Sequence, residues 1–492
     1  METATGEDVE HLDVLIIGAG ISGIGCAYYL QREHPGKSFA LLEARGATGG
    51  TWDLFRYPGI RSDSDLFTFG YEFRPWESDV ALADGPEILR YVRETAAEYG
   101  VDQKVRLHHR VISADWSTEQ ARWNVEVERT DSGERVRLSA GWIFAGTGYY
   151  HYDQGYTPPL PGVERYGGQL IHPQQWPENL DYAGKQVLVI GSGATAVTLI
   201  PALAAAAGHV TMLQRSPSYI LSIPLRDPVA RLLSRLFGPR RGFALNRRVS
   251  IFRQNAIYKL CQRYPKQSRA VLRRLTAHAL PDGFAVDEHF NPKYDPWDQR
   301  LCIVPDGDLF KAISNGSASV VTDTIETFTE RGVQLASGRE LEADIIITAT
   351  GLRLLVFGGI SVSVDGEPVK LPERLAFKGM MLSGVPNLAY LVGYTNVSWT
   401  LKIGPVCEHF CRLLALMDER GYRQCTPELP YPHMTTRPLL NFGAGYVQRS
   451  LDELPRQGMF DPWYLAMDPT VDSRNLRHGP VEDRHLRFEV AA

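Results

Sequence analysis

The sequence predicts an α/β protein with two parallel sheets in separate domains. The first observation is a short apolar run, rich in β-branched residues, at 14–17 and again at 187–190, as in strands that are buried on both faces. The second is that a glycine-rich segment and then a helical pattern follow each run, as in strand–turn–helix units. The length of 492 residues is enough for two or three domains, so each unit can belong to its own sheet.

The composition is that of a globular protein, with 44% hydrophobic and 22% charged residues. The net charge of −5, from 52 basic and 57 acidic residues, gives no support to nucleic-acid binding by the whole chain. The six cysteines form no Cys-x-x-Cys pair and no metal-ligand spacing, so we expect reduced core thiols and no metal site. Residues 1–10 lack the apolar run of a signal peptide, and the expected location is the cytoplasm.

The first glycine-rich segment, 18–23, follows the predicted strand 14–17. Its glycines allow a tight turn and bring a pyrophosphate close to backbone N–H groups at the start of a helix. A second predicted strand, 39–42, ends in Glu43, where an acid accepts hydrogen bonds from a ribose 2′-hydroxyl. These features predict a site for FAD or NAD rather than a structural turn. The predicted binding residues are Gly18, Gly20, Ser22, Gly23 and Glu43.

The segment Gly49-Gly50-Thr51-Trp52 favours FAD. A glycine turn with a hydroxyl and an aromatic ring can lie close to a second phosphate or to the flavin. The alternative is an ordinary loop with one core tryptophan. The predicted FAD-binding residues here are Gly50, Thr51, Trp52 and Asp53.

The second glycine-rich segment, 191–196, follows the predicted strand 185–190 and has alanine in place of the third glycine. The next predicted strand, 210–213, ends in Gln214-Arg215-Ser216 rather than in an acid. A cation and a hydroxyl suit a 2′-phosphate, so NADPH is favoured over NADH; the alternative is a solvated arginine. The predicted NADP-binding residues are Gly191, Ser192, Gly193, Ala194, Thr195, Ala196, Arg215 and Ser216.

Two nucleotide sites on one chain imply a flavin that a nicotinamide reduces. A disulfide reductase needs a cysteine pair beside the flavin, and the absence of Cys-x-x-Cys argues against that class. Oxygen activation is the other enzymatic option. A flavin-binding redox sensor without catalysis is the third hypothesis.

A loop between the two glycine-rich segments, 166–177, reads aromatic-x-Gly-x-x-x-His-x-x-x-Trp-Pro, with Gly168, His172 and Trp176 at its fixed positions. In this loop the chain resembles the Baeyer–Villiger flavin monooxygenases. Tyr166 stands where the family usually has phenylalanine. Relatives that oxidise only heteroatoms carry tyrosine or phenylalanine at the position of Trp176, so this tryptophan favours the Baeyer–Villiger branch.

The resemblance extends over nearly the whole chain, and the motifs at 49–53, 56–65, 297–302 and 393–399 are most similar to ethionamide-activating members of the family. It implies a FAD domain in two parts, an NADPH domain inserted into it, and a helical insert inside the NADPH domain. The implied segments are 1–150 and 349–492 for FAD, 151–218 and 299–348 for NADPH, and 219–298 for the insert.

The resemblance also implies the chemistry. NADPH reduces FAD, and oxygen adds to give a C4a-peroxyflavin that inserts an oxygen atom into ketones, forming esters or lactones, and can oxygenate sulfides or thioamides. Heteroatom oxygenation as the main activity is the alternative.

Residue roles follow by position in the family motifs. Arg300 corresponds to the catalytic arginine, where a permanent cation stabilises developing negative charge, and Asp63 would orient it; the alternative is a buried salt bridge without catalytic effect. Gln299 replaces a lysine that often helps to bind the 2′-phosphate, which leaves more of that task to Arg215. Further implied residues are Asp63 and Val111 for FAD, and Arg61, Ser62 and Asp63 for NADP.

The segment 226–274 is helical in pattern and strongly basic, with Asp227 as its only carboxylate. In the family such an insert lies near the substrate entrance. One interpretation is peripheral contact with an anionic membrane that admits lipophilic substrates; the other is a solvated helical face. The segment 431–484 contains no motif that indicates a role, and the sequence does not predict an oligomeric state.

Overall fold

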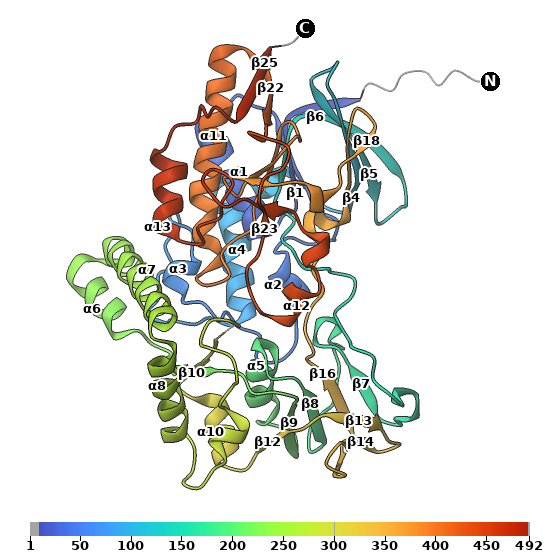
Figure 1. Cartoon of the computed structure of the whole chain (residues 1–492), viewed down its shortest axis with the longest axis vertical. Helices are drawn as coiled ribbons and strands as arrows, with labels where there is room; N and C mark the ends of the chain where they lie inside the picture. Colours follow the sequence, from blue (N-terminus) through green and yellow to red (C-terminus); the bar gives the residue numbers. More distant parts are fainter. Residues whose placement is uncertain (1–8, 300, 491–492) are drawn as a thin grey trace.

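Strand β1 (Glu10–Ile17) lies at the centre of the larger sheet of this computed structural model, which describes residues 9–299 and 301–490 (Figure 1). It pairs in parallel with β2 (Phe39–Leu42) and with β6 (Arg135–Ala145). The full order is β18-β17-β4-β5-β6-β1-β2-β3, and β21 pairs with β6 and leads to β20 and β19. The other strands are β3 (Val105–Arg106), β4 (His109–Ser117), β5 (Arg122–Arg129), β17 (Ser361–Val364), β18 (Glu367–Pro368), β19 (Ala376–Phe377), β20 (Met381–Leu382) and β21 (Leu388–Tyr390).

Strand β1 is apolar on both faces because both faces are covered. Val14 and Ile16 pack with helices α1 (Ile21–Glu33), α4 (Gly85–Glu98) and α11 (Ile403–Arg420). Leu15 and Ile17 pack on the opposite side, in a core that contains the fully buried Trp116 and Trp123. This is the burial expected for a continuous apolar strand.

The second sheet is parallel throughout, in the order β12-β9-β8-β16-β7. Helices α5 (Ala194–Leu203) and α10 (Asp308–Ser314) cover one face, and a three-stranded antiparallel sheet, β13-β14-β15, covers the other. The strands are β7 (Gln169–Ile171), β8 (Gln186–Ile190), β9 (His209–Gln214), β12 (Ala318–Thr322), β13 (Ile325–Phe328), β14 (Gly332–Leu335), β15 (Glu340–Glu342) and β16 (Ile345–Thr348).

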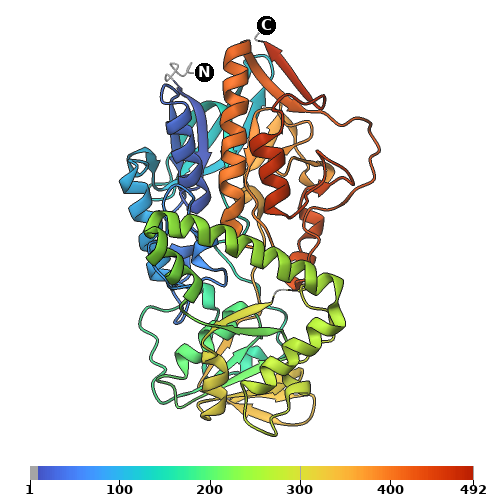
Figure 2. The ribbon, with the colours of Figure 1, turned by 90° about the vertical axis from the view of Figure 1, so that its left-hand side faces the viewer.

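A helical insert leaves the second sheet through β10 (Ile220–Ile223) and returns through β11 (Cys302–Pro305), which pair with each other. Its long helix α7 (Pro239–Arg263) runs across the boundary between the upper and lower parts of the molecule in Figure 2. Arg247 of α7 is buried and donates to the carbonyls of Phe67 and Gly70 at 2.9 and 2.7 Å, which fastens the insert to the first part. The other helices of the insert are α6 (Pro228–Phe237), α8 (Pro265–His278) and α9 (Val286–His289).

The C-terminal segment returns to the first part of the molecule (Figure 1). Its strand β22 (Tyr422–Pro427) pairs with β25 (Leu486–Val490), and β23 (Arg437–Pro438) pairs with β24 (Arg456–Gln457). The remaining short helices are α2 (Thr51–Leu54), α3 (Leu66–Phe69), α12 (Gly445–Gln448) and α13 (Pro469–Asp472).

The predicted α/β class is confirmed, but only the second sheet is parallel throughout. The larger sheet is mixed: β1, β2, β3 and β6 pair in parallel, whereas β4, β5 and β6 form an antiparallel unit. Both glycine-rich segments lie between a strand and a helix, β1 to α1 and β8 to α5. The basic segment 226–274 is helical as predicted, in α6, α7 and most of α8. None of the helices in the described part of the chain is long and apolar enough to cross a membrane.

Candidate functional site

A cavity of about 1070 Å³ lies between the two sheets and reaches both glycine-rich turns. The turn after β1 and the turn after β8 both contribute to its wall. Ligands of open α/β sheets bind at the carboxyl ends of the strands, and here two such edges face one shared space. The cavity can therefore bring two nucleotides together.

The turn after β1 forms the first end of the cavity. Gly18 has a φ of +98° and its N–H donates to the Leu42 carbonyl at 2.8 Å. Gly23 lies behind the turn and does not line the cavity: a Cβ at Gly23 would be 1.9 Å from the Gly18 oxygen, so the helix packs against the turn only with glycine here. The predicted FAD-binding residues that line the cavity are Gly18, Gly20, Ser22, Glu43, Gly50, Thr51, Trp52, Asp63 and Val111.

Glu43 is buried beside this turn. Its carboxylate accepts the backbone N–H groups of Ala19 and Arg45, both at 3.0 Å. Burial raises the pKa of Glu43, and these two hydrogen bonds oppose the rise. The carboxylate is thus held in a fixed orientation at the carboxyl end of β2, where the ribose of a dinucleotide lies in this type of unit.

The predicted segment 50–53 divides between the cavity and the core. Thr51 lines the cavity, with its hydroxyl 3.2 Å from the Tyr152 hydroxyl. Asp53 is 3% exposed and does not line the cavity. Its carboxylate pairs with Arg45 and Arg93, each at 2.7 Å, so its contact with a ligand would be indirect, through Arg45.

The turn after β8 forms the second end. Gly191 has a φ of +136°, and its N–H donates to the Leu213 carbonyl at 2.8 Å. A Cβ at Gly193 would meet no atom within 4 Å, so the space before the N-terminus of α5 is open and of the kind that a phosphate fills. Ala196 is fully buried behind the turn. The predicted residues that line this end are Gly191, Ser192, Gly193, Ala194, Thr195, Arg215 and Ser216.

Strand register shows which residue corresponds to Glu43. Leu42 lies opposite Ile17, and Leu213 lies opposite Ile190, so the counterpart of Glu43 is Gln214. The Gln214 amide turns away from the cavity and donates to the His289 carbonyl at 2.7 Å and to the Thr322 hydroxyl at 2.9 Å. Arg215, the cation predicted to bind the 2′-phosphate, therefore lies one residue beyond the position that corresponds to Glu43.

The predicted residues 61–63 all line the cavity, but they differ in their contacts. Arg61 is held by Asp308, with its two Nη atoms at 2.6 and 3.4 Å from the carboxylate. The Ser62 hydroxyl donates to the Ser64 carbonyl at 2.8 Å. Arg300 lies outside the described residues.

The loop residues Gly168, His172 and Trp176 do not line the cavity. His172 donates from Nε2 to the Gly351 carbonyl and accepts the Gln174 N–H at Nδ1, both at 3.2 Å. Burial lowers the pKa of His172, which agrees with a neutral ring in this arrangement. Trp176 packs against the apolar core of the second sheet. The loop therefore contacts the cavity wall indirectly: His172 reaches Gly351, the Gln174 amide donates to the Tyr152 carbonyl at 2.8 Å, and the Gln175 amide donates to the Asp153 carbonyl at 3.1 Å.

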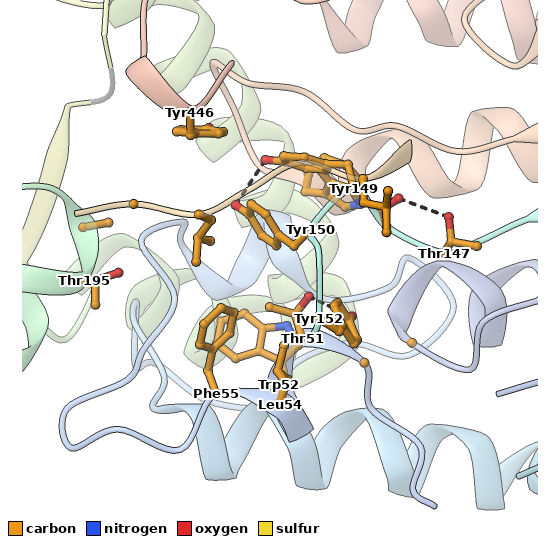
Figure 3. Close-up of a pocket in the computed structure, with 18 of the residues that line it drawn as sticks. Thr51, Trp52, Leu54, Phe55, Thr147, Tyr149, Tyr150, Tyr152, Thr195 and Tyr446 are labelled. Atoms are coloured by element: carbon orange, nitrogen blue, oxygen red, sulfur yellow. Dashed lines mark hydrogen bonds between the residues drawn. The ribbon is translucent and has the colours of Figure 1, made fainter. Parts of the chain in front are cut away.

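Sequence reasoning missed the aromatic wall of the cavity, which includes Tyr149, Tyr150, Tyr152, Trp399 and Tyr446. Figure 3 shows Trp52 and Phe55 on one side of the space, and Tyr149, Tyr150 and Tyr446 across from them. The Tyr149 ring stacks on Trp399 at 4.7 Å between centroids. The run of tyrosines directly after the glycine turn 146–148 was a usable signal, whereas Tyr446 lies in a segment without a motif.

The chain is similar in sequence to known flavoproteins. A family model described as pyridine nucleotide-disulphide oxidoreductase matches residues 12–237. The FAD-containing monooxygenase EthA of Mycobacterium tuberculosis is 54% identical over 480 residues, which is 97% of this chain and 98% of the relative. The EthA protein of Mycolicibacterium smegmatis is 50% identical over 97% of both chains.

Solved structures share the fold at lower identity. An oxidised steroid monooxygenase bound to NADP has a TM-score of 0.75 at 21% identity and covers 98% of this chain and 100% of its own. An open cyclohexanone monooxygenase has a TM-score of 0.74 at 19% identity with the same coverage.

Proposed function

The chain belongs to the family of FAD-containing monooxygenases, and from this premise we propose that it uses NADPH and O2 to insert an oxygen atom into ketones and to oxygenate sulfides or thioamides. The observation that carries the proposal is one cavity that joins the turn after β1 and Glu43, at the end of β2, to the Arg215 end of the second sheet. A nicotinamide bound at one turn and a flavin bound at the other can meet inside it. The tryptophan of the loop 166–177, Trp176, supports ketone oxidation through the family resemblance.

The residues of the first turn fit FAD. The N-terminus of α1 faces the cavity and favours a pyrophosphate, Glu43 is oriented toward the place of a ribose, and the aromatic wall offers apolar faces to a flavin. This assignment makes 1–150 and 349–492 the FAD domain. The tertiary contact of β21 with β6 supports the joining of those two segments.

The residues of the second turn fit NADPH. The open space before α5 suits a pyrophosphate, and Arg215 and Ser216 offer a cation and a hydroxyl for a 2′-phosphate. This assignment makes 151–218 and 299–348 the NADPH domain and 219–298 its insert. The parallel pairing of β16 with β7 and β8 supports it.

FAD held by the first turn would supply the redox chemistry between NADPH and oxygen. Arg300 would stabilise the negative charge that develops on the substrate oxygen, because a guanidinium stays protonated throughout. Asp63 lines the cavity, and its role would be to orient Arg300. The aromatic wall excludes water from the reacting atoms, which strengthens these electrostatic effects.

The decisive test is a panel of linear, cyclic and aryl ketones and sulfides, with NADPH consumption and oxygenated product measured together. The proposal expects ester or lactone from at least one ketone class in proportion to the NADPH consumed. Sulfoxides without any ester would favour heteroatom oxygenation as the main activity. A FAD-loaded protein that consumes no NADPH in the presence of these substrates would contradict the proposal.

Arg300→Ala tests the assigned catalytic residue. We expect the variant to keep FAD and its reduction by NADPH but to lose about a hundredfold or more in ester formation, the usual effect of removing one group that stabilises an oxyanion. Arg420→Ala, at the exposed end of α11, is a matched control. Full ester formation by Arg300→Ala would remove this residue from the mechanism.

We also propose that the helical insert contacts an anionic membrane surface. Helix α6 exposes Leu232, Leu236 and Phe237 by 55%, 65% and 50%, and Phe252 of α7 is 75% exposed. The only carboxylate in 226–274, Asp227, is buried and accepts N–H groups at the start of α6. Some basic residues of the segment pair with carboxylates, as Arg226 does with Asp79 and Arg273 with Asp287, but basic residues far outnumber these partners. Exposed apolar side chains among many arginines are typical of helices that lie in a lipid interface.

Charge favours lipid over a second copy of the chain. A symmetric contact between two inserts would place one basic surface against another, and like charges disfavour such a contact. Anionic lipid headgroups complement the same surface. A lipophilic ketone or thioamide could then reach the enzyme from the membrane.

Sedimentation with vesicles tests this contact. We expect binding to phosphatidylglycerol vesicles but not to phosphatidylcholine vesicles, weakening as salt is added. Leu236→Glu should lower the binding, whereas Leu170→Glu, at an exposed position of the second sheet, should not. Equal binding to both lipids, no binding, or a dimer that Leu236→Glu dissociates would contradict the proposal.

A further inference from the structure

The arginines of the cavity wall differ in whether a carboxylate neutralises them. Among the described residues, three are paired: Arg45 with Asp53 at 2.7 Å, Arg61 with Asp308 at 2.6 Å, and Arg110 with Asp153 at 3.9 Å. The two others that line the cavity, Arg215 and Arg449, form no ion pair with a described carboxylate. Arg215 already has an assigned ligand in the 2′-phosphate of NADPH, and Arg449 has none.

The Arg449 guanidinium is held in place although none of the described carboxylates pairs with it. Its Cζ lies 3.5 Å from the centroid of the Tyr156 ring, a stacked arrangement that fixes the plane of the group. Its Nη2 donates to the Leu352 carbonyl at 3.4 Å. A Cβ at Gly445 would be 3.2 Å from Nη1, so the backbone of α12 closes on the group from another side. A guanidinium has five N–H donors, and the hydrogen bond to Leu352 uses one.

Arg449 lies against the two connections that join the sheets, at the wall of the cavity that both nucleotide turns share. Tyr156 is on the outgoing connection between the sheets, and Leu352 is on the returning one. The two connections are joined at Gly351, whose carbonyl accepts the N–H of Tyr156 at 3.1 Å and Nε2 of His172 at 3.2 Å. Arg449 directly follows α12, whose Tyr446 also lines the cavity. The cation is therefore placed where a substrate or the middle of the nicotinamide nucleotide can lie.

We propose that Arg449 is an anion-recognising residue of this cavity and that its ligand is an oxyanion, either a carboxylate of the substrate or a phosphate of the nicotinamide nucleotide. A planar guanidinium that is stacked on a ring presents its N–H edge to such a group with little loss of side-chain freedom. The Arg449 side chain remains exposed to solvent at the cavity wall, so an anion in the cavity can reach its free N–H groups. If the anion belongs to the substrate, the inference rests on the proposed function; if it belongs to the nucleotide, it does not depend on which substrate is oxygenated.

Equilibrium binding tests the inference without turnover. Calorimetric titrations of the FAD-loaded enzyme would use three probes: NADP+, a linear methyl ketone, and the same ketone with a terminal carboxylate. Arg449→Gln should weaken by about tenfold either the binding of NADP+ or the binding of the carboxylated ketone, which is the loss of one charge-assisted hydrogen-bonded contact. Arg449→Lys should recover part of the loss. Arg420→Gln, an exposed cation at the end of α11, should change neither.

The pattern of losses identifies the source of the anion. If the variant binds NADP+ more weakly but binds both ketones with unchanged affinity, Arg449 contacts a phosphate of the nucleotide. If the variant loses the preference for the carboxylated ketone over the plain one, Arg449 contacts the substrate. Unchanged affinity for all three probes would overturn the inference. Weaker binding of the plain ketone by the same factor would also overturn it, because a general disturbance of the cavity, not charge recognition, would then explain the effect. Failure of every ketone to yield product would count against the proposed function alone, since these titrations need no reaction.

Discussion

The two glycine-rich turns are built on one scaffold, and two of the differences between them bear on what each turn binds. In each, the glycine after the strand donates its N–H to the last leucine of the neighbouring strand at 2.8 Å, Gly18 to Leu42 and Gly191 to Leu213. These two differences are the third small residue of the turn and the residue that follows the neighbouring strand. The scaffold thus makes both sites phosphate-binding turns, and one or two side chains decide which nucleotide each can accept.

The third small residue of each turn, Gly23 or Ala196, sets how closely the following helix packs against the turn. At Gly23 a Cβ would be 1.9 Å from the Gly18 oxygen, whereas Ala196 is accommodated with its side chain fully buried. Helix α1 therefore packs more closely onto its turn than α5 does. The first turn therefore tolerates no side chain at this position, whereas the second accommodates a methyl group.

The largest expected effect comes from Gly23→Ala. The added methyl group would displace the backbone of Gly18, and such overpacking costs about 1–3 kcal/mol of stability. We expect protein purified with little FAD and with a lower unfolding temperature, measured by flavin absorbance and calorimetry. The matched change in the other turn, Ala196→Gly, should keep full FAD and cost only about 0.5–1 kcal/mol. Equal FAD content in the two variants would show that the turns do not differ as described.

The next largest effect concerns the nucleotide preference of the second turn. Arg215→Ala removes the cation assigned to the 2′-phosphate, and we expect KM for NADPH to rise about tenfold or more while KM for NADH changes little. Arg215→Lys should retain part of the preference. If the ratio of the two KM values stays the same, another group reads the 2′-phosphate.

Glu43→Gln should weaken FAD binding by about tenfold. The carboxylate accepts the N–H groups of Ala19 and Arg45 with different oxygens, but an amide has only one oxygen. One buried N–H would lose its acceptor, which costs about 1–3 kcal/mol. Titration of the FAD-free protein with FAD measures the change, and Glu134→Gln, in an exposed turn, is the control. Unchanged affinity would show that Glu43 does not support the FAD site.

The smallest effect is a dependence of stability on pH at the connection between the sheets. Burial lowers the pKa of His172 in the folded protein, so its neutral form contributes stability that is complete above the ordinary pKa of about 6.5 and is lost as pH falls below it. Between pH 7 and pH 5 the unfolding temperature of the native protein should therefore fall more than that of His172→Asn, by about 2 °C or less. A parallel decline in both proteins would contradict this role.

The features that could be predicted from sequence are those encoded by neighbouring residues. Both strand–turn–helix units, Glu43 and the basic helices follow from local patterns, and the structure contains them where they were predicted. The assembly of the aromatic wall and the place of Arg449 could not be predicted, because residues 250 positions apart, Tyr149 and Trp399, meet only after folding. Asp53 was misleading for another reason: its side chain turns toward the protein and pairs with Arg45 and Arg93, and the spacing of residues does not reveal such packing.

The discontinuous first part has a consequence for synthesis on the ribosome. Strand β1 emerges before every other described element, yet its Val14 and Ile16 face is completed by α11, nearly 400 residues later. The second sheet needs nothing beyond β16. The domain that begins second can therefore finish folding first, and the nascent chain carries an uncovered apolar sheet face for most of its translation. We expect the native enzyme to depend on chaperones during synthesis more than its final stability suggests.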